Sequence, residues 1–398
     1  MTSQFHKLKS KILTDPYNFI IFRERKGREV YLVGGYIRDI LRGIHSRDRD
    51  YVINGDIQPF VDEINEIIKG SIVRFKKGDM LRIVTNDGFT LDFSRLIDSL
   101  EKDLSKRDFT INAIAWSPEK GGIDLFKSIK DIKKKKVRSI HKKNLVSDPL
   151  RMLRAYRFAA ELNGSIETRT RELIKMLHNN IKIVSPERIT LEIFNLLNSK
   201  QSSKYLKMAF SDNILSEIFH ISSNKLSRNI KEISSLENIT LSKLPQKFKV
   251  MLHKIFSQNL TYKGLLCLEL LLQHGSAEEL SWHKIKMSTS IRKRIELVHK
   301  SIKAKLKLNN KVFDIFKDSK EASFDILILA DRLELLKDYM RFKKIWKKGL
   351  LSSSEISRLS NLKEGPLLGK LITELKRAQF EGRLKSKKSA VDFIKKYL

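Results

Sequence analysis

The chain has 398 residues, and its 41% of hydrophobic and 8% of aromatic residues are typical of a globular protein with about two to four packed units. Its 79 Lys and Arg residues outnumber 46 Asp and Glu residues, which gives a formal net charge of +33. A charge of this size predicts a polyanionic partner that is bound in a strongly salt-dependent way.

A membrane surface is the competing partner for so basic a chain, but the sequence argues against it. We find no signal peptide, no lipidation motif and no apolar run long enough to span a bilayer. The longest candidate, GLLCLELLLQ, contains Glu269 and predicts a buried helix. Cys267 is the only cysteine, which excludes a disulfide or a cysteine-based metal site within the chain and fits a reducing cytoplasm.

Residues 1 to about 140 mix short β-rich runs with about two or three helices, one of them over Tyr36–Arg42. The expected strands are Val30–Val33, Tyr51–Asn54, Ile72–Phe75, Leu81–Thr85, Thr90–Phe93 and Ile111–Trp116. The rest has Leu, Ile, Lys and Glu at helical spacing, with Ser and Asn clusters near 198–204 and 222–240 that favour connections. The pattern predicts an α/β head with a mixed sheet, followed by an all-α remainder.

A glycine pair, Gly34 and Gly35, separates the first expected strand from the first expected helix. Glycines let the backbone approach a ligand closely, and a helix N-terminus offers free N–H groups to phosphate oxygens. Arg38 adds a forked cation in the same place. We therefore expect a triphosphate to bind at this turn.

Two aspartates, Asp48 and Asp50, begin the next expected strand. Side chains at i and i+2 point to the same face of a strand, so the two carboxylates can share divalent metal ions. Two Mg²⁺ ions roughly 3.5 to 4 Å apart would activate an RNA 3′-hydroxyl and neutralise charge on the α-phosphate and the leaving pyrophosphate. A lone GG is usually a turn and a lone DxD a solvated strand end, but GGxxRD followed by DxD is much more specific for nucleotidyl transfer.

Arg107 and Asp108 precede the last expected strand of the head. Asp108 can accept a hydrogen bond from a ribose 2′-hydroxyl, and Arg107 can hold phosphate or orient that carboxylate. A surface ion pair is the plainer interpretation of these two residues taken alone.

Asp148 and Arg151 lie around Pro149, at the expected start of a helix, with Arg154 one turn further on. Asp148 alone is best interpreted as a helix N-cap. An Asp acceptor beside an Arg donor also complements the base edge of cytosine or adenine, whereas uracil and guanine present the opposite order. Arg154 can stack on the base or support its neighbours.

These segments resemble the bacterial-type (class II) tRNA nucleotidyltransferases and poly(A) polymerases, within the polymerase-β-like superfamily. LVGGYIRDILRG with DRDYVI is similar to the family's first motif, LSKRDFTINAIAW to its second, and SDPLRMLRAYRFAAEL to its base-selecting motif. GGIDLFKSIKDIKKKKVRSI and SPERITLEIFNLL resemble the segments that flank that motif, and GPLLGKLITELKRAQFEGRLKSKKSA resembles the terminal helices. The resemblance spans nearly the whole chain, although residues 205 to 350 carry little of it.

The resemblance implies a nucleotidyltransferase head over residues 1–140, a neck with the base-selecting motif over 141–204, a helical body over 205–300 and a basic tail over 301–398. It also implies Mg²⁺ on Asp48 and Asp50, and nucleotide binding by Gly34, Gly35, Arg38, Arg107, Asp108, Asp148, Arg151 and Arg154. The implied partners are the acceptor stem and 3′ end of tRNA, with CTP and possibly ATP; no protein partner can be inferred.

Three departures from the family pattern bear on specificity. Lys106 replaces the usual Arg, and Ser147 replaces the Glu that usually precedes Asp148. Only 12 residues separate Arg95 from Asp108, where enzymes that add C-C-A carry a longer flexible loop. The short segment is typical of relatives that add only C-C, so we expect addition of C-C from CTP.

Other functions stay open at this stage. They are full C-C-A addition, A addition or poly(A) synthesis, and non-catalytic RNA binding supported by charge alone. From Arg341 to Leu398 we count 16 Lys and Arg against 5 Asp and Glu, so the tail is expected to bind tRNA.

Overall fold

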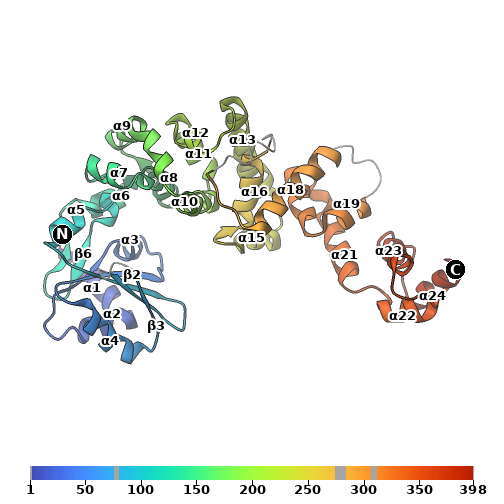
Figure 1. Cartoon of the computed structure of the whole chain (residues 1–398), viewed down its shortest axis with the longest axis horizontal. Coiled ribbons are helices and arrows are strands. Elements are labelled where there is room, and N and C mark those ends of the chain that lie inside the picture. The colour runs from blue at the N-terminus through green and yellow to red at the C-terminus, as the bar shows by residue number, and fades with distance from the viewer. Residues whose placement is uncertain (1, 76–79, 274–283, 306–311, 398) are drawn as a thin grey trace. The chain divides into compact units, whose positions relative to one another are not determined.

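The computed structural model describes residues 2–75, 80–273, 284–305 and 312–397. The chain forms two compact units: residues 1–227 with 276–286, and residues 228–275 with 287–398 (Figure 1). The expected division into four parts is finer than this and stays a prediction.

The first unit begins with a seven-stranded sheet in the order β3-β4-β5-β2-β1-β6-β7. Only β2 and β5 pair in parallel, so the sheet is mixed, as expected. Its strands are β1 (Val30–Val33), β2 (Asp48–Ile53), β3 (Ser71–Arg74), β4 (Met80–Val84), β5 (Thr90–Arg95), β6 (Ala115–Ser117) and β7 (Gly121–Ile123).

The two faces of this sheet have separate apolar cores. Tyr51 and Ile53 of β2 face one core, which also takes buried side chains from the helices α1 to α4. Val52 faces the other core, together with Leu104 of α5. The helical segments of the head are α1 (Thr2–Leu13), α2 (Pro16–Arg23), α3 (Gly35–Leu41), α4 (Ile57–Ile68), α5 (Leu100–Ser105) and the short 3₁₀ helix η1 (Thr110–Asn112).

A helical region completes the first unit. Its central helix α8 packs against α10 and α11, and buries Leu153, Tyr156 and Ala159. The segments are α6 (Ser128–Lys133), β8 (Lys136–Val137), α7 (Lys142–Ser147), α8 (Leu150–Leu162), β9 (Ser165–Ile166), α9 (Thr168–Leu177), η2 (His178–Ile183), α10 (Pro186–Asn198), α11 (Ser202–Ser211), α12 (Ile214–Ile218) and the start of α13 (Ser223–Ser235).

The described part of the second unit is helical apart from one small hairpin. Its elements after α13 are η3 (Leu236–Thr240), α14 (Leu241–Lys243), α15 (Gln246–Leu252), β10 (Ile255–Ser257), β11 (Leu260–Thr261), α16 (Tyr262–Leu271), α18 (Thr289–Lys305), α19 (Val312–Ser319), η4 (Lys320–Ala322), α20 (Ser323–Leu329), η5 (Leu333–Leu335), α21 (Leu336–Lys347), α22 (Ser353–Ser360), α23 (Pro366–Phe380) and α24 (Lys387–Tyr397). The GLLCLELLLQ segment lies in and just after α16 and is almost entirely buried, which confirms the prediction. No helix in the described ranges is long and apolar enough to cross a membrane.

Three expectations about local structure were wrong. Residues 2–75 and 80–140 contain six α-helices, α1 to α6, where about two or three were expected. The segment Ile111–Trp116 begins as the 3₁₀ helix η1 and becomes a strand only at Ala115. The Ser- and Asn-rich stretch at 222–240 is mostly the helix α13, because Leu226, Ile230 and Ile233 recur at helical spacing and are buried.

Candidate active site

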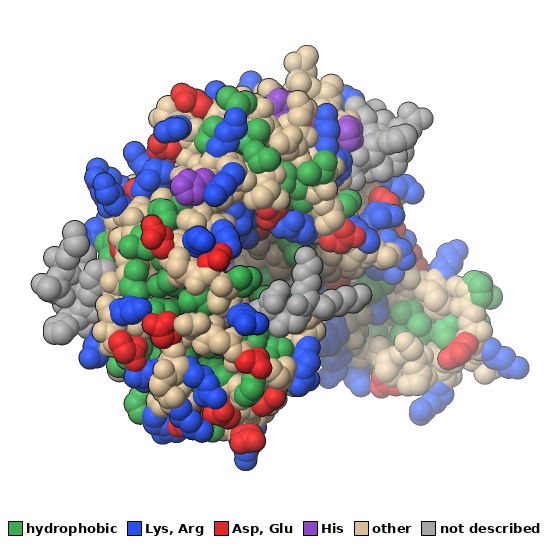
Figure 2. All heavy atoms as spheres, turned by 60° about the vertical axis from the view of Figure 1, so that its left-hand side comes forward, with side chains coloured by type: hydrophobic (Ala, Val, Ile, Leu, Met, Phe, Trp, Pro, Cys, Tyr) green, Lys and Arg blue, Asp and Glu red, His purple; other side chains and the backbone are tan. Residues whose placement is uncertain are grey.

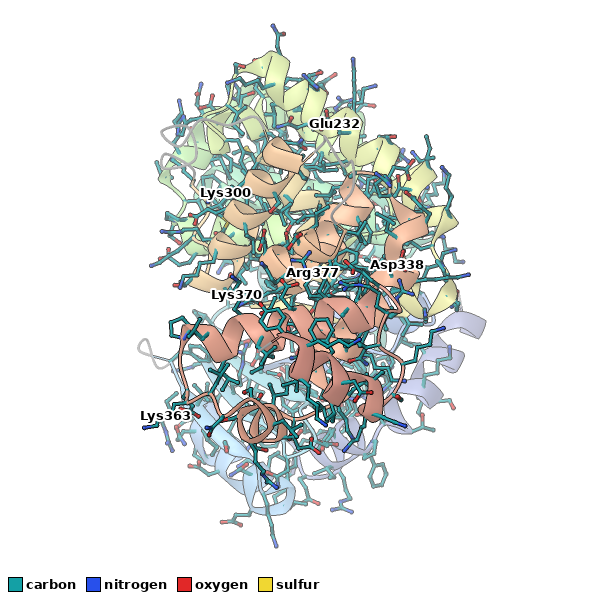
Figure 3. The ribbon with its side chains drawn as sticks, turned by 90° about the vertical axis from the view of Figure 1, so that its right-hand side faces the viewer. Glu232, Lys300, Asp338, Lys363, Lys370 and Arg377 are labelled. Carbon is teal, nitrogen blue, oxygen red and sulfur yellow. The ribbon has the colours of Figure 1, made fainter. Side chains whose placement is uncertain are left out.

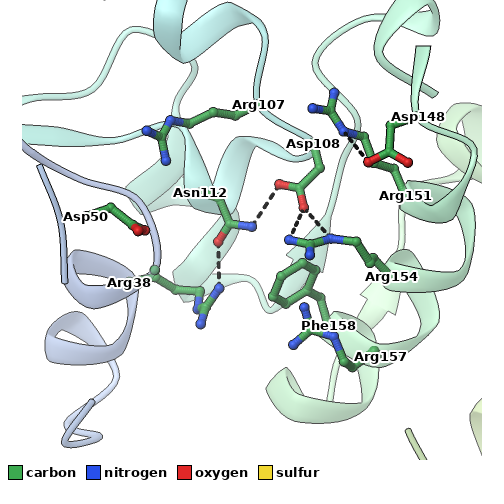
Figure 4. Close-up of a pocket in the computed structure, with 11 residues that line it drawn as sticks. Arg38, Asp50, Arg107, Asp108, Asn112, Asp148, Arg151, Arg154, Arg157 and Phe158 are labelled. Atoms are coloured by element: carbon green, nitrogen blue, oxygen red, sulfur yellow. Dashed lines mark hydrogen bonds and ion pairs between the residues drawn. The ribbon is translucent and has the colours of Figure 1, made fainter. Parts of the chain in front are cut away.

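A cavity of about 400 Å³ lies between the head sheet and α8 in the first unit (Figure 4). Eleven residues line it: Gly35, Arg38, Asp50, Arg107, Asp108, Asn112, Asp148, Arg151, Arg154, Arg157 and Phe158. Five of them are arginines and three are aspartates, so the cavity suits an anionic ligand. The lining includes all of the residues predicted from the sequence except Gly34 and Asp48.

The acidic pair takes the predicted arrangement on β2. Asp48, Asp50 and Val52 alternate with Arg49, Tyr51 and Ile53, whose side chains face the α1–α4 core. The two carboxylates therefore share the opposite face of the sheet. Because β2 and β5 run parallel with Asp50 in register with Asp92, Asp92 joins them on that face.

The electrostatics of this face favour a cation. Burial raises the pKa of the Asp50 carboxyl, Arg107 opposes the rise, and Asp92 and Asp48 add to it. Asp92 is neutralised by a forked ion pair with Arg82 at 2.6 and 2.7 Å, whereas Asp50 has no such pair in the described part of the chain. A partly buried carboxylate beside two others is stabilised by added positive charge.

The carboxylates on this face fit a divalent metal ion whose coordination shell is completed by oxygens of the substrate. Among the described residues, no group of three or more His, Cys, Asp or Glu side chains is placed to hold a metal by itself. Mg²⁺ is commonly bound through one or two carboxylates together with substrate phosphate oxygens. Asp48 and Asp50 meet that requirement.

The glycine turn brings the backbone close to this face. Gly34 has φ +79°, and a Cβ added there would lie 2.6 Å from Nη1 of Arg107 and 3.4 Å from Oδ2 of Asp50. Its backbone N–H donates to the carbonyl of Ile114 at 2.9 Å, which ties the turn to the start of β6. Glycine is therefore required both by backbone conformation and by the approach of Arg107.

A methyl group at Gly34 is expected to disturb nucleotide binding through Arg107. Gly34→Ala should lower stability by about 1–3 kcal/mol because of its positive φ, and should also raise KM for the nucleotide. Gly43→Ala is the matched control, since Gly43 has φ +72° but nothing within 4 Å of the added Cβ. Melting curves and steady-state kinetics would check both variants; an equal KM for the two would contradict the role of Arg107.

Arg38 lies in the cavity wall on α3 and is largely occupied by neighbours. Its guanidinium forms a forked pair with Asp39 at 3.0 and 3.1 Å, donates to Oδ1 of Asn112 at 2.5 Å, and lies 5.0 Å from the ring centre of Phe158. The group is thus held rigidly, with its charge partly balanced before any ligand binds.

Asp108 is buried at the centre of the cavity, and both of its oxygens are hydrogen-bonded (Figure 4). Its Oδ1 accepts from the side chain of Asn112 and the backbone N–H of Phe109, both at 2.8 Å; its Oδ2 pairs with Arg154 at 2.7 and 2.9 Å. Burial would raise the pKa of this carboxyl, but Arg154, Asn112 and the Phe109 amide hold it below its usual value. Asp108 is therefore an anion.

Arg107 does not pair with Asp108. Its guanidinium reaches Asp103 at 3.2 and 3.3 Å, one turn back on α5. The plain interpretation of Arg107 and Asp108 as a surface ion pair is therefore wrong, because the two side chains have different partners.

Asp148 presents an unsatisfied oxygen. Oδ2 accepts from Nη2 of Arg188 at 2.8 Å and lies 3.9 Å from Nε of Arg151, while Oδ1 is buried and has no hydrogen-bond partner in the described ranges. A buried acceptor without a partner is costly unless a ligand supplies the donor. Burial also lowers the pKa of the Arg151 guanidinium beside it.

The helix-cap interpretation of Asp148 is wrong. Pro149 is the N-cap residue of α8, no side chain caps this helix, and Asp148 contributes only its backbone carbonyl to the N–H of Arg151 at 3.0 Å. Its Oδ1 therefore caps no helix and can accept a hydrogen bond from a ligand in the cavity.

Arg151, Arg154 and Arg157 follow one another at intervals of three along α8, and all three line the cavity. Glu192 of α10 balances the last two, at 3.5 Å from Arg154 and 2.6 Å from Arg157. Arg157 also pairs with Glu161 at 2.5 Å. Arg157 was not predicted as a site residue, although it follows Arg154 by the same three residues that separate Arg154 from Arg151.

Two family models match separate parts of the chain. The family model described as the poly A polymerase head domain matches residues 30–138, and the one described as the probable RNA and SrmB-binding site of polymerase A matches residues 165–226. The CC-adding tRNA nucleotidyltransferase of Synechocystis sp. is 27% identical over 387 residues, with 91% of this chain and 92% of the relative covered.

The head and the helical segment after it are therefore similar to the tRNA nucleotidyltransferase and poly(A) polymerase family. Members of this nucleotidyltransferase family generally use a divalent metal. The CCA-adding enzyme of Leuconostoc mesenteroides is 31% identical over 210 residues, 48% of this chain and 51% of its own length, so the chain spans about half of that relative. The fold matches the Thermotoga maritima CCA-adding enzyme in complex with tRNA, with a TM-score of 0.75, 21% identity and 97% of both chains covered.

Two departures from the family pattern lie beside the cavity without lining it. Ser147 ends α7, and its hydroxyl donates to the carbonyl of Asn144 at 3.2 Å. Lys106 lies 3.6 Å from Asp98 and is exposed. Neither side chain makes a hydrogen bond or ion pair with the predicted base-selecting residues in the described structure.

Proposed function

We propose that this protein, as a member of its nucleotidyltransferase family, adds nucleotides without a template to the 3′ end of tRNA that lacks its terminal C-C-A, with CTP as a donor and Mg²⁺ as the metal. The observation that carries the proposal is the pairing of an acidic strand, Asp48 and Asp50, with an arginine-lined cavity that holds an unsatisfied Asp148 beside Arg151. The names of the Synechocystis and Leuconostoc relatives support tRNA as the acceptor.

The triphosphate rests at the glycine turn, with Gly34 and Gly35 allowing its close approach and Arg38 and Arg107 adding positive charge. Asp48 and Asp50 would hold the metal. When bound, the metal supplies activation of the tRNA 3′-hydroxyl and neutralises charge on the reacting phosphate. The protein then contributes position and electrostatic stabilisation rather than a covalent step.

The base edge is read by Asp148 and Arg151. The unpaired Oδ1 of Asp148 accepts from the exocyclic amino group of cytosine or adenine, and Arg151 donates to the neighbouring ring nitrogen. Uracil or guanine would place a carbonyl against the carboxylate and an N–H against the guanidinium. The cavity therefore selects C and A by the order of donor and acceptor alone.

The ribose meets Asp108. Both oxygens of this carboxylate are occupied, so a 2′-hydroxyl can bind Oδ2 only when Arg154 gives up one of its two contacts there. The ion pair of Arg154 with Glu192 at 3.5 Å would keep the guanidinium near Asp108. Nucleotide binding thus exchanges one partner of Asp108 for another without leaving the carboxylate unpaired.

C-C-A addition and C-C-only addition differ at the segment before Asp108. Residues 96–107 contain only the short helix α5, capped by Ser99 and anchored by the buried Leu104, so the described chain has no long loop there. The CCA-adding names of several relatives favour the full sequence. The short segment favours C-C-only addition as a second candidate, and the name of the Synechocystis relative agrees with it.

End sequencing of the product decides between these candidates and tests the function as a whole. Trimmed tRNA incubated with CTP should gain C-C; with CTP and ATP, a C-C-only enzyme stops there and a full enzyme ends in C-C-A. Long A tracts from ATP alone would indicate a poly(A) polymerase. No extension under any mixture would contradict the proposed function and favour non-catalytic RNA binding.

We propose that the tail binds the tRNA body. The side chains of Lys363 and Lys370 stand at the outer edge of the tail helices (Figure 3). A cut before Arg341 would divide α21 and expose Phe313 and Phe316, which pack on Phe342, so deletion of the tail is a poor test.

Substitution of three exposed lysines on α24 avoids that problem. Changing Lys388, Lys395 and Lys396 to Gln should weaken tRNA binding and lower the salt slope by about 0.7 to 0.9 for each phosphate that is no longer neutralised. CTP binding should not change. Anisotropy titrations over a salt series would check this; equal weakening of tRNA and CTP binding would indicate misfolding instead.

We propose that the reaction takes place in the cytoplasm, since Cys267 is the only cysteine and the chain can form no disulfide within itself. Basic side chains spread widely over the face of the first unit that is in front in Figure 2, with fewer acidic ones between them. This distribution suits a large anionic partner that contacts much of that face.

A further inference from the structure

The second unit has a cavity of its own, of about 220 Å³, which the reaction does not use. Side chains from five helices and η4 enclose it: Lys247, Phe248 and Met251 from α15, Tyr262 from α16, Arg294 from α18, Glu321 from η4, Phe324 from α20, and Tyr339, Met340 and Lys343 from α21. It lies entirely within one compact unit, so its shape does not depend on how the two units are arranged.

Four of the ten residues that line this cavity are aromatic. The rings of Phe248 and Phe324 lie 5.7 Å apart at 30°, and the other two aromatic residues are Tyr262 and Tyr339. The hydroxyl groups of both tyrosines make no hydrogen bond to a described residue. Burial raises the pKa of Tyr339 to about 12, so its hydroxyl remains a donor at neutral pH.

A fixed cation closes one side. Nε of Arg294 pairs with Asp325 at 2.6 Å, and its Nη2 donates to the carbonyl of Glu321 at 2.5 Å. These two contacts leave the guanidinium little freedom to move. Arg294 is therefore held in place by the protein and needs no ligand to fix its position.

Two exposed cations lie at the rim. Nζ of Lys247 is 4.9 Å from the ring centre of Phe248, and Lys343 lies one turn after Tyr339 on α21. Neither lysine has an ion-pair partner within the described ranges. Exposed lysines beside an aromatic slot are suited to phosphates on either side of a bound ring.

Size and chemistry together select the ligand. Aromatic walls favour a flat ring, the tyrosine hydroxyls and Arg294 offer polar contacts to its edge, and the rim favours negative charge. The volume is below the roughly 300 to 1,000 Å³ of sites for drug-sized ligands, so it admits one base and excludes a stacked pair. Bases inside a duplex cannot enter, because both of their faces are stacked.

We propose that this cavity holds one unpaired base of the bound RNA, with Lys247 and Lys343 on the flanking phosphates. The choice of tRNA as that RNA rests on the proposed function. The base comes from a loop or an extruded position rather than from the paired acceptor stem. The site would then distinguish an RNA that carries an accessible unpaired nucleotide from a plain duplex.

The binding test compares two RNAs in parallel. Tyr262→Leu removes the ring but keeps an apolar side chain, and Lys343→Gln removes an exposed charge without affecting packing. Each should raise Kd for whole tRNA by about fivefold to a hundredfold, as expected when base stacking or a phosphate contact is removed, and leave Kd for a blunt acceptor-stem duplex unchanged. Lys231→Gln, at an exposed site on α13, is the charge-matched control and should change neither.

Crosslinking then locates the base. Met340 is 41% exposed and lines the cavity, while the native Cys267 is buried, so Met340→Cys can be labelled selectively with a photoreactive group. Primer extension should map the crosslink to one unpaired nucleotide. Crosslinks spread along the paired stem, equal weakening of tRNA and duplex binding, or protection of the label by free CTP alone would each overturn the proposal.

A further measurement distinguishes failure of the base-cavity proposal from failure of the proposed nucleotidyl transfer. CMP incorporation into the duplex should be the same for wild type and Tyr262→Leu. If wild type incorporates nothing but the tRNA-specific weakening of binding remains, the base cavity stands and the reaction assignment falls.

Discussion

Asp48→Ala and Asp50→Ala are expected to abolish nucleotide incorporation while leaving tRNA affinity within about twofold of wild type. Each change removes a proposed metal ligand, and metal stabilisation of a transferring phosphoryl group is worth several kcal/mol, which corresponds to on the order of 10³-fold in rate or more. tRNA binding depends on distributed Lys and Arg contacts instead. Single-turnover transfer of labelled CMP and anisotropy titration with tRNA measure the two quantities separately.

Asp62→Ala provides the control for this pair. Asp62 is an exposed carboxylate on α4 of the same head, and its contact with Arg74 is long, at 3.9 Å. It should incorporate CMP at the wild-type rate. Turnover retained by both Asp48→Ala and Asp50→Ala would refute the metal assignment, and inactivity of Asp62→Ala would show that the head tolerates no charge change.

Asp148→Ala is expected to relax base choice rather than stop the chemistry. The unpaired Oδ1 is the proposed acceptor that distinguishes the amino group of cytosine from the carbonyl group of uracil. Without this oxygen, binding of uracil should no longer carry the cost of an unpaired polar group. That penalty is about 1–3 kcal/mol, so the preference for CTP over UTP should fall by roughly 5- to 150-fold. Competition between CTP and UTP for incorporation, followed by end sequencing, gives this ratio directly.

The partner of Asp148 offers a useful comparison. Arg188→Ala removes the 2.8 Å contact to Oδ2 but leaves Oδ1 in place, so discrimination should weaken less than in Asp148→Ala. An unchanged CTP preference in Asp148→Ala would mean that another group reads the base. Complete absence of CMP incorporation would mean that Asp148 serves the reaction and not the choice of base.

Local features of the fold and site could be predicted from the sequence. The alternation that places Asp48 and Asp50 on one face depends only on strand geometry, and the structure has it. The strand–glycine–helix order around Gly34 is likewise local. The helical remainder followed from the spacing of apolar residues, although Ser- and Asn-rich composition concealed α13.

Contacts between distant segments could not be predicted. Asp92 joins the acidic face only because β5 pairs with β2, and sequence alone does not give the strand order. The partner of Asp108 is 46 residues away, and that of Asp148 is 40 residues away. Asn112 was not predicted as a site residue. It was expected in a strand, but Thr110–Asn112 forms a 3₁₀ helix and the Asn112 side chain lines the cavity.

The acidic pair and its metal are central to the proposed reaction. A crystal soaked with CTP and Mn²⁺ and measured for anomalous scattering tests them most directly. We predict an anomalous peak that marks a metal ion coordinated by carboxylate oxygens of both Asp48 and Asp50 and by the triphosphate. A bound nucleotide with no metal at these two side chains, or with the metal elsewhere, would contradict the proposed mechanism.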